Sequence, residues 1–201
     1  MVSNEEISVN KRNGRGKESL QIDKIHAMVG FATEGITGVS ASHVEMNSGI
    51  QLFDGISTAD IQQILIKSAN DLITLENPNY QYVAARLLLF SLRKQLFHRL
   101  WDHPKLIDHI KKLIDMGLYD KDILVNYDES EIDRMDMWID HERDYNFTYA
   151  GLRQVMDKYL VQDRSTGDIF ETPQFMYMMI SATLFAQYPK DKRMSYVKKY
   201  Y

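Results

Sequence analysis

The feature that most constrains the fold is a segment from about Tyr80 to Trp101 that reads as one long helix. The centre of this segment is apolar on nearly every side of the helix. Its apolar residues are Val83, Ala84, Leu87, Leu88, Leu89 and Phe90. A helix without a polar face must be covered by other elements. The segment therefore predicts a helical domain built around it.

Shorter amphipathic helices are predicted on both sides of this segment, because apolar residues recur there at intervals of three and four. The expected starts are Asp23 for a helix to Thr33, Ser42 with its capping-box partner Glu45, and Thr58, or Ser57 with Asp60. Further helices are expected over residues 106–116, 129–140, 148–160 and 173–188 and in the C-terminal stretch. The fold class is therefore mainly α.

Two β-hairpins complete the predicted elements. The first covers residues 6–22, with Ile7 and Val9 in one strand, Leu20 and Ile22 in the other, and a turn over residues 13–16. The second joins residues 159–161 to residues 168–170, and Gly167 suits a left-handed turn position. Asp102-His103-Pro104 is the best boundary between two domains, over residues 1–101 and 102–201.

Composition excludes several classes of protein. The net charge of −4 and the pI near 5.9 argue against a general nucleic-acid binder. The chain has no cysteine, which excludes disulfides, thiolate nucleophiles and zinc ribbons. No stretch approaches the roughly 20 apolar residues of a membrane helix, and the polar N-terminus does not resemble a signal peptide. These features favour a soluble, cytoplasmic protein.

A group of basic residues is a candidate phosphate site. Lys11 and Arg12 are adjacent in the first strand, Lys24 lies in the first turn of the next helix, and Thr58 begins a later one. Unpaired N–H groups at a helix N-terminus favour anions, and Lys94 is a further cation. Each of these residues also has an ordinary reading as a solvated side chain or a cap. No pattern predicts catalytic residues or a metal site, and residues 140–144 point to different sides of a helix.

Several motifs resemble one family. Residues 9–14 are similar to the V-x-K-R-D-G opening of the ATP-cone, a small domain that binds ATP or dATP. Residues 18–25, 54–61 and 80–87 resemble its second strand, its D-G-x-x-T-x-D-I segment and the Y-Q-Y-x-A-A-R-L helix. Residues 141–144, 147–149, 158–161, 173–175 and 196–201 resemble the helical region that follows the cone in class I ribonucleotide reductase large subunits. The resemblance therefore spans nearly the whole chain.

The resemblance implies a fold and a site. It implies that residues 1–101 form an ATP-cone, a β-hairpin plus a four-helix bundle, followed by a truncated helical region with a short hairpin. The nucleotide-binding residues carried over by motif are Lys11, Arg12, Glu18, Ser19, Leu20, Gln21, Ile22, Asp23, Lys24, Thr58 and Lys94. Among these, Lys11, Arg12 and Lys24 would hold the phosphates of ATP or dATP, together with Mg²⁺. Asn13 and Gln62 depart from the family pattern, which has an acid and often a histidine there.

The same resemblance implies a role in deoxyribonucleotide synthesis. The family enzyme is an oxidoreductase that uses a thiyl radical and a cysteine pair in a catalytic barrel. This chain stops before the barrel and has no cysteine, so alone it is not expected to turn over substrate. The implied partners are the polypeptide with the barrel and the small radical subunit, and a homo-oligomer is left open. The alternative is a free-standing ATP-cone module that senses nucleotides without a reductase role.

Overall fold

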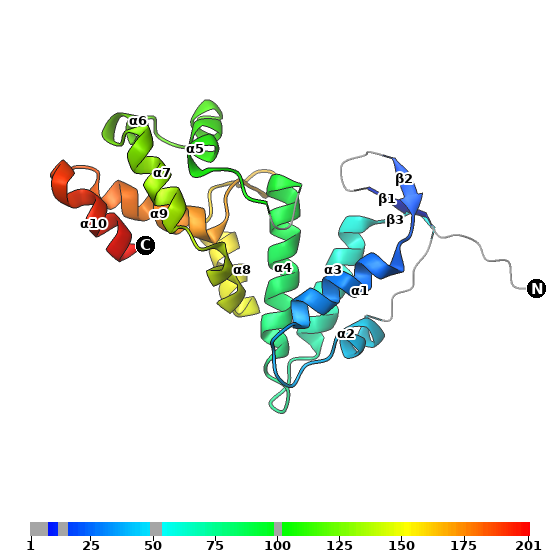
Figure 1. Cartoon of the computed structure of the whole chain (residues 1–201). Helices are drawn as coiled ribbons and strands as arrows, with labels where there is room; N and C mark the ends of the chain where they lie inside the picture. Colours follow the sequence, from blue (N-terminus) through cyan, green and yellow to red (C-terminus); the bar gives the residue numbers. More distant parts are fainter. Residues whose placement is uncertain (1–7, 12–15, 49–53, 99–101) are drawn as a thin grey trace, which may run out of the picture. The chain divides into compact units, whose positions relative to one another are not determined.

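The computed structural model describes residues 8–11, 16–48, 54–98 and 102–201, and these residues are mainly helical, as predicted (Figure 1). The described residues form two compact units. The first unit lies within Met1–Ser91 and Tyr145–Leu152, and the second within Leu92–Asp144 and Arg153–Tyr201. The predicted boundary between residues 101 and 102 remains a proposal about domains. None of the helices in these described ranges combines the length and the apolar character that a bilayer crossing requires.

A small sheet opens the first unit. Its strands are β1 (Ser8–Asn10), β2 (Lys17–Ser19) and β3 (Ile56–Ser57), in the order β2-β1-β3. The pairing of β1 with β2 is antiparallel, as the predicted hairpin requires, whereas β3 joins β1 in parallel. The prediction of a hairpin alone was therefore incomplete. Placing Leu20 and Ile22 in the second strand was wrong, because that strand ends at Ser19 and Ile22 already begins a helix.

Four helices follow in this part of the chain: α1 (Ile22–Thr33), α2 (Ala41–Asn47), α3 (Thr58–Asp71) and α4 (Tyr80–Phe97). Helix α1 packs inward through Ile25, Val29 and Ala32, which are buried. Two predicted starts were wrong. Gln21, not Asp23, is the N-cap of α1, and Ser42 lies inside α2, whose N-cap is Ser40.

The start of α3 and the centre of α4 agree with the sequence patterns. Ser57, one of the two predicted caps, accepts a hydrogen bond from the Asp60 N–H at 3.0 Å. All six apolar residues predicted at the centre of α4 are buried. The helix ends at Phe97 and is followed by His98 with φ 59°. The prediction that it continues to Trp101 falls on residues 99–101, outside the described ranges.

The rest of the chain is also helical. Its elements are α5 (Leu106–Asp115), α6 (Asp122–Asn126), α7 (Glu129–Trp138), a 3₁₀ helix (His141–Asn146), α8 (Tyr149–Lys158), α9 (Pro173–Phe185) and α10 (Lys190–Tyr200). The four longer predicted helices are confirmed with shorter ends. The short α6 and the 3₁₀ helix were not predicted, because one turn carries too few residues to show a period.

The second unit has its own core, to which α5, α7, α9 and α10 all contribute. Asp128 and Glu131 form a capping box at the start of α7. Glu131 is also paired with Arg193 of α10, and both side chains are buried. The predicted second hairpin is present as β4 (Gln162–Asp163) and β5 (Asp168–Ile169), but placing its first strand at residues 159–161 was wrong, because β4 begins only at Gln162. Gly167 in its turn has φ +77°, which other residues rarely adopt.

Candidate functional site

The central strand β1 brings distant parts of the first unit to one end of the sheet. Asn10 is the last paired residue of β1, and it lies opposite Lys17 of β2 and Ser57 of β3. Lys11 follows Asn10, and Thr58 follows Ser57 as the first residue of α3. Because β1 and β3 run in the same direction, Lys11 and Thr58 leave the sheet at the same end.

The turn before β3 is held to β1 by several hydrogen bonds. The Ser8 N–H and hydroxyl both donate to Asp54 Oδ1, the N–H at 3.0 Å. Asn10 Nδ2 donates to the Gly55 carbonyl at 2.6 Å, and Gly55 has φ +86°. The hydrogen bond from the Ser8 hydroxyl lowers the pKa of Asp54. These contacts give the Asp54-Gly55 pair a structural role, which is to fix the position of β3 and the head of α3.

Charged side chains gather at this end of the sheet. Lys11 Nζ lies 2.8 Å from Glu18 Oε2, and both side chains are partly exposed. The hydrogen bond from Lys11 lowers the pKa of Glu18, and the charge of Lys24 acts in the same direction. Lys24 stands in the first turn of α1, where backbone N–H groups lack intrahelical partners and no side chain caps the helix. An anion that displaced Glu18 from Lys11 would therefore meet two ammonium groups and the N-terminus of α1.

The other predicted nucleotide-binding residues lie in several different elements. Ser19 ends β2, and Leu20 and Gln21 link it to α1, where Ile22 and Asp23 are exposed in the first turn. Arg12 and Asn13 lie outside the described residues. Lys94 is exposed on α4, in the part of that helix that belongs to the second unit. The nucleotide-binding role of the whole set remains a prediction.

Gln62 and two residues of the motif at residues 80–87 connect segments of the first unit. Gln62 is buried, and its Nε2 donates to the Leu87 carbonyl at 2.8 Å, which ties α3 to α4. The Tyr80 hydroxyl accepts from the Ser40 N–H at 3.1 Å. Arg86 Nη1 donates to the Glu34 carbonyl at 2.6 Å. These roles were not predicted, since a motif does not show which partner a side chain will meet.

The motif at residues 141–144 contributes one buried side chain, Asp144, to the second unit. Asp144 Oδ1 accepts from Gln174 Nε2 at 2.7 Å, and Arg93 Nη2 lies 3.5 Å from Asp144 Oδ2. Burial raises the pKa of Asp144 to about 6. The same Arg93 nitrogen donates to the His141 carbonyl at 2.7 Å. No group of His, Asp and Glu within the described ranges is arranged to hold a metal ion.

Comparison with known families identifies two regions of the chain. Residues 7–95 match the model of the ATP cone domain, and residues 145–201 match the model of the ribonucleotide reductase all-alpha domain. The first region contains the sheet, the charged residues Lys11, Glu18 and Lys24, and Thr58 at the start of α3. The second contains α8, α9 and α10.

Individual relatives match nearly the whole chain. The ribonucleoside-diphosphate reductase subunit alpha of Haemophilus influenzae is 48% identical over 198 residues, which is 98% of this chain and 26% of that protein. The ribonucleoside-diphosphate reductase 1 subunit alpha of Escherichia coli is 46% identical over the same share of each. The subunit alpha of Enterobacteria phage T4 is 42% identical over 195 residues, 97% of this chain and 25% of that protein. The chain thus spans about a quarter of the length of the relatives it matches.

Proposed function

The chain belongs to the class I ribonucleoside-diphosphate reductase alpha-subunit family, as an N-terminal part with an ATP-cone, and we propose that it binds ATP or dATP as an allosteric effector. In this proposal Lys11, Arg12 and Lys24 hold the phosphates, with Mg²⁺ as the accompanying cation. Residues 18–23 contact the base and the sugar, Thr58 adds a hydroxyl, and Lys94 contributes from α4. The nucleotide acts on the subunit by stabilising one assembly over another.

The observation that best supports this proposal is the parallel pairing of β1 with β3. It directs Lys11 and Thr58 to the same end of the sheet, although 46 residues separate them in the sequence. Lys24 acts on the same carboxylate as Lys11, so two positive charges and the head of α3 are available to one triphosphate. Charge-assisted hydrogen bonds to phosphate are among the stronger contacts that side chains make.

Calorimetric titration of the chain with Mg-ATP and with Mg-dATP tests this proposal. Replacing Lys11 and Lys24 by alanine together should weaken binding on the order of a hundredfold, because each lost charge-assisted hydrogen bond costs about 1.5 kcal/mol or more. The matched control is Lys67→Ala, which removes an exposed lysine from the middle of α3. Absence of saturable binding in the unchanged chain, or equal binding by the double variant, would refute the site.

The proposed role extends to the whole reductase. We propose that the catalytic barrel lies in the part of the alpha subunit outside this chain, and that the small radical subunit joins the assembly. The match of residues 145–201 to the reductase all-alpha domain favours this role over a free-standing sensing module. Reconstitution of nucleotide-dependent ribonucleoside-diphosphate reduction with the remaining parts would separate these two functions.

A further inference from the structure

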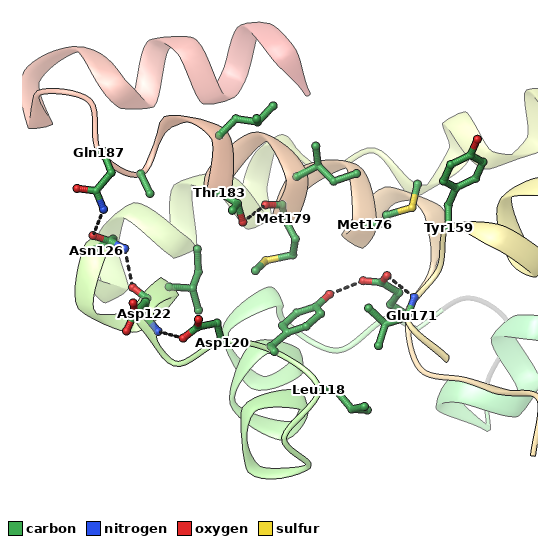
Figure 2. Close-up of a pocket in the computed structure, with 16 residues that line it drawn as sticks. Leu118, Asp120, Asp122, Asn126, Tyr159, Glu171, Met176, Met179, Thr183 and Gln187 are labelled. Carbon is green, nitrogen blue, oxygen red and sulfur yellow. Dashed lines mark hydrogen bonds between the residues drawn. The ribbon is translucent and has the colours of Figure 1, made fainter. Parts of the chain in front are cut away.

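A groove of about 600 Å³ lies on the surface of the second unit (Figure 2). One wall is α9, and the opposite wall is formed by α6 and by the residues that precede it. Residues from the ends of the second hairpin close the groove. Its apolar lining comprises Leu118, Ile123, Tyr159, Val161, Met176, Met179, Ile180 and Leu184.

Three large apolar side chains that line the groove are exposed to solvent. Leu184 is 62% exposed, Tyr159 is 60% exposed and Ile180 is 48% exposed. Ile180 and Leu184 are four residues apart on α9, so they lie on the same face of the helix. Met176 and Ile123 also line the groove, and both are buried. A contiguous apolar hollow of this kind indicates an interaction site, whereas isolated exposed leucines do not.

The charged side chains that line the groove are all acidic. Asp120 and Asp122 are exposed at its edge, and no lysine or arginine is among the described residues that line it. The third acid, Glu171, is buried and already occupied, because it accepts hydrogen bonds from the Tyr119 hydroxyl and from the Val161 N–H. The edge therefore favours a partner that carries a positive charge beside its apolar side chains.

We propose that this groove seats an apolar segment, with a basic residue facing Asp120 and Asp122, from the part of the reductase alpha subunit outside this chain. The proposal rests on the proposed function. The relatives match this chain over 98% of its length, but this match covers only 26% of their own length. A large body of the same subunit is therefore available as a partner. Interfaces that are permanent are more apolar than the rest of a surface, which agrees with the lining of the groove.

Hydroxyl-radical footprinting measures the exposure of these side chains directly. The probe is a full-length chimera in which this chain replaces the matching part of the Haemophilus influenzae alpha subunit, to be compared with the chain alone. Oxidation of Tyr159, Ile180 and Leu184 should fall at least about fivefold in the chimera, because interface cores are packed like protein interiors. Val125 of α6, 79% exposed, and Met137 of α7, 73% exposed, lie outside the groove and serve as controls. Unchanged oxidation of Ile180 and Leu184 would overturn the proposal.

A substitution gives a second, independent test. Leu184→Asp should leave the thermal unfolding of the chain alone unchanged, because the side chain is exposed there, and should lower the unfolding temperature of the chimera. Val125→Asp should change neither protein. Protection of the groove in the chain alone, together with dimerisation that Leu184→Asp abolishes in sedimentation, would identify a second copy as the occupant and overturn the proposal.

The test of the docking groove and the test of nucleotide binding give independent results. The change in Mg-ATP binding that the combined Lys11→Ala and Lys24→Ala substitutions cause in the chimera reports on the ATP-cone, because the rest of the alpha subunit is unchanged. Nucleotide binding without protection of the groove would refute the docking surface and leave the proposed function standing. Protection without nucleotide binding would support the docking surface and refute the effector site.

Discussion

Replacing Arg193 by methionine is expected to destabilise the second unit strongly. Arg193 Nε donates to Glu131 Oε1 at 3.1 Å, and its Nη2 donates to Glu131 Oε2. The side chains of Arg193 and Glu131 are 4% and 7% exposed, so water cannot replace the lost contacts. The guanidinium also lies over the ring of Tyr127, with 4.4 Å between Cζ and the ring centroid. The variant removes all of these contacts and leaves the Glu131 carboxylate buried without its counter-ion.

The expected loss is about 3 kcal/mol of the free energy of unfolding, at the lower end of the range for breaking a buried ion pair. The lower end applies because Glu131 Oε2 keeps one donor, the Asp128 N–H at 3.1 Å. A double variant with Glu131→Leu as well should be more stable than Arg193→Met alone. It no longer buries an unpaired charge, and it loses mainly the capping box, which is worth about 1 kcal/mol.

Urea unfolding followed by the fluorescence of Trp138 measures these differences. Trp138 ends α7 in the second unit, and a Trp101→Phe background makes it the sole tryptophan. The matched control is Lys192→Met, which changes an exposed residue beside Arg193 and should shift the free energy of unfolding by less than about 0.5 kcal/mol.

Two results would refute the reasoning. One is a loss below about 1 kcal/mol for Arg193→Met, which is the size expected of an ordinary substitution. The other is a double variant less stable than Arg193→Met, because the unpaired carboxylate would then not be the source of the cost.

Two further predictions concern the buried polar groups. Gln62→Met should destabilise the first unit by about 1 kcal/mol, because the Leu87 carbonyl inside α4 loses its side-chain donor and α3 loses this tie to α4; a thermal unfolding curve equal to that of the unchanged chain would contradict this. Acid should destabilise the second unit, because burial lowers the pKa of His109 to about 4 and of His141 to about 3, whereas both take up protons near pH 6.5 when unfolded. Stability is thus complete above pH 6.5 and is lost as the pH falls. Asp144, whose pKa burial raises to about 6, and Glu171, whose pKa burial also raises, offset part of this loss. Urea midpoints that do not fall between pH 6.5 and pH 4 would contradict this prediction.

The sequence predicted those elements whose signal lies in a long periodic pattern. The centre of α4 is an example, since a helix apolar on all sides leaves only a buried position. The two-residue strand β3 gave no such signal, because its position depends on pairing with β1 more than 40 residues earlier. The start of α1 was misplaced for a related reason: Gln21 is an unusual N-cap, and Asp23 fits the common preference better.

The sequence proposes members for the candidate site, whose nucleotide-binding role stays a prediction, but it does not indicate their geometry. Lys11, Lys24 and Thr58 were selected from motifs, and the pairing of Lys11 with Glu18 follows from a register that the turn residues alone do not determine. In the sequence, Gln62 stands out only as a departure from the family pattern. Its buried hydrogen bond to α4 depends on how two helices pack, which no local pattern specifies.

The parallel pairing of β1 with β3 has a consequence for the order in which the first unit folds. The β1–β2 hairpin can form as soon as residues 8–19 have been synthesised, because its contacts are local. Joining Val9 to Ile56 closes a loop of about fifty residues, with an entropic cost of about 3 kcal/mol. The hydrogen bonds of Ser8 and Asn10 to the Asp54-Gly55 turn therefore form late. A growing chain in which α3 has not yet been synthesised therefore contains Lys11 and Lys24 of the proposed site but lacks the N-terminus of α3 with Thr58.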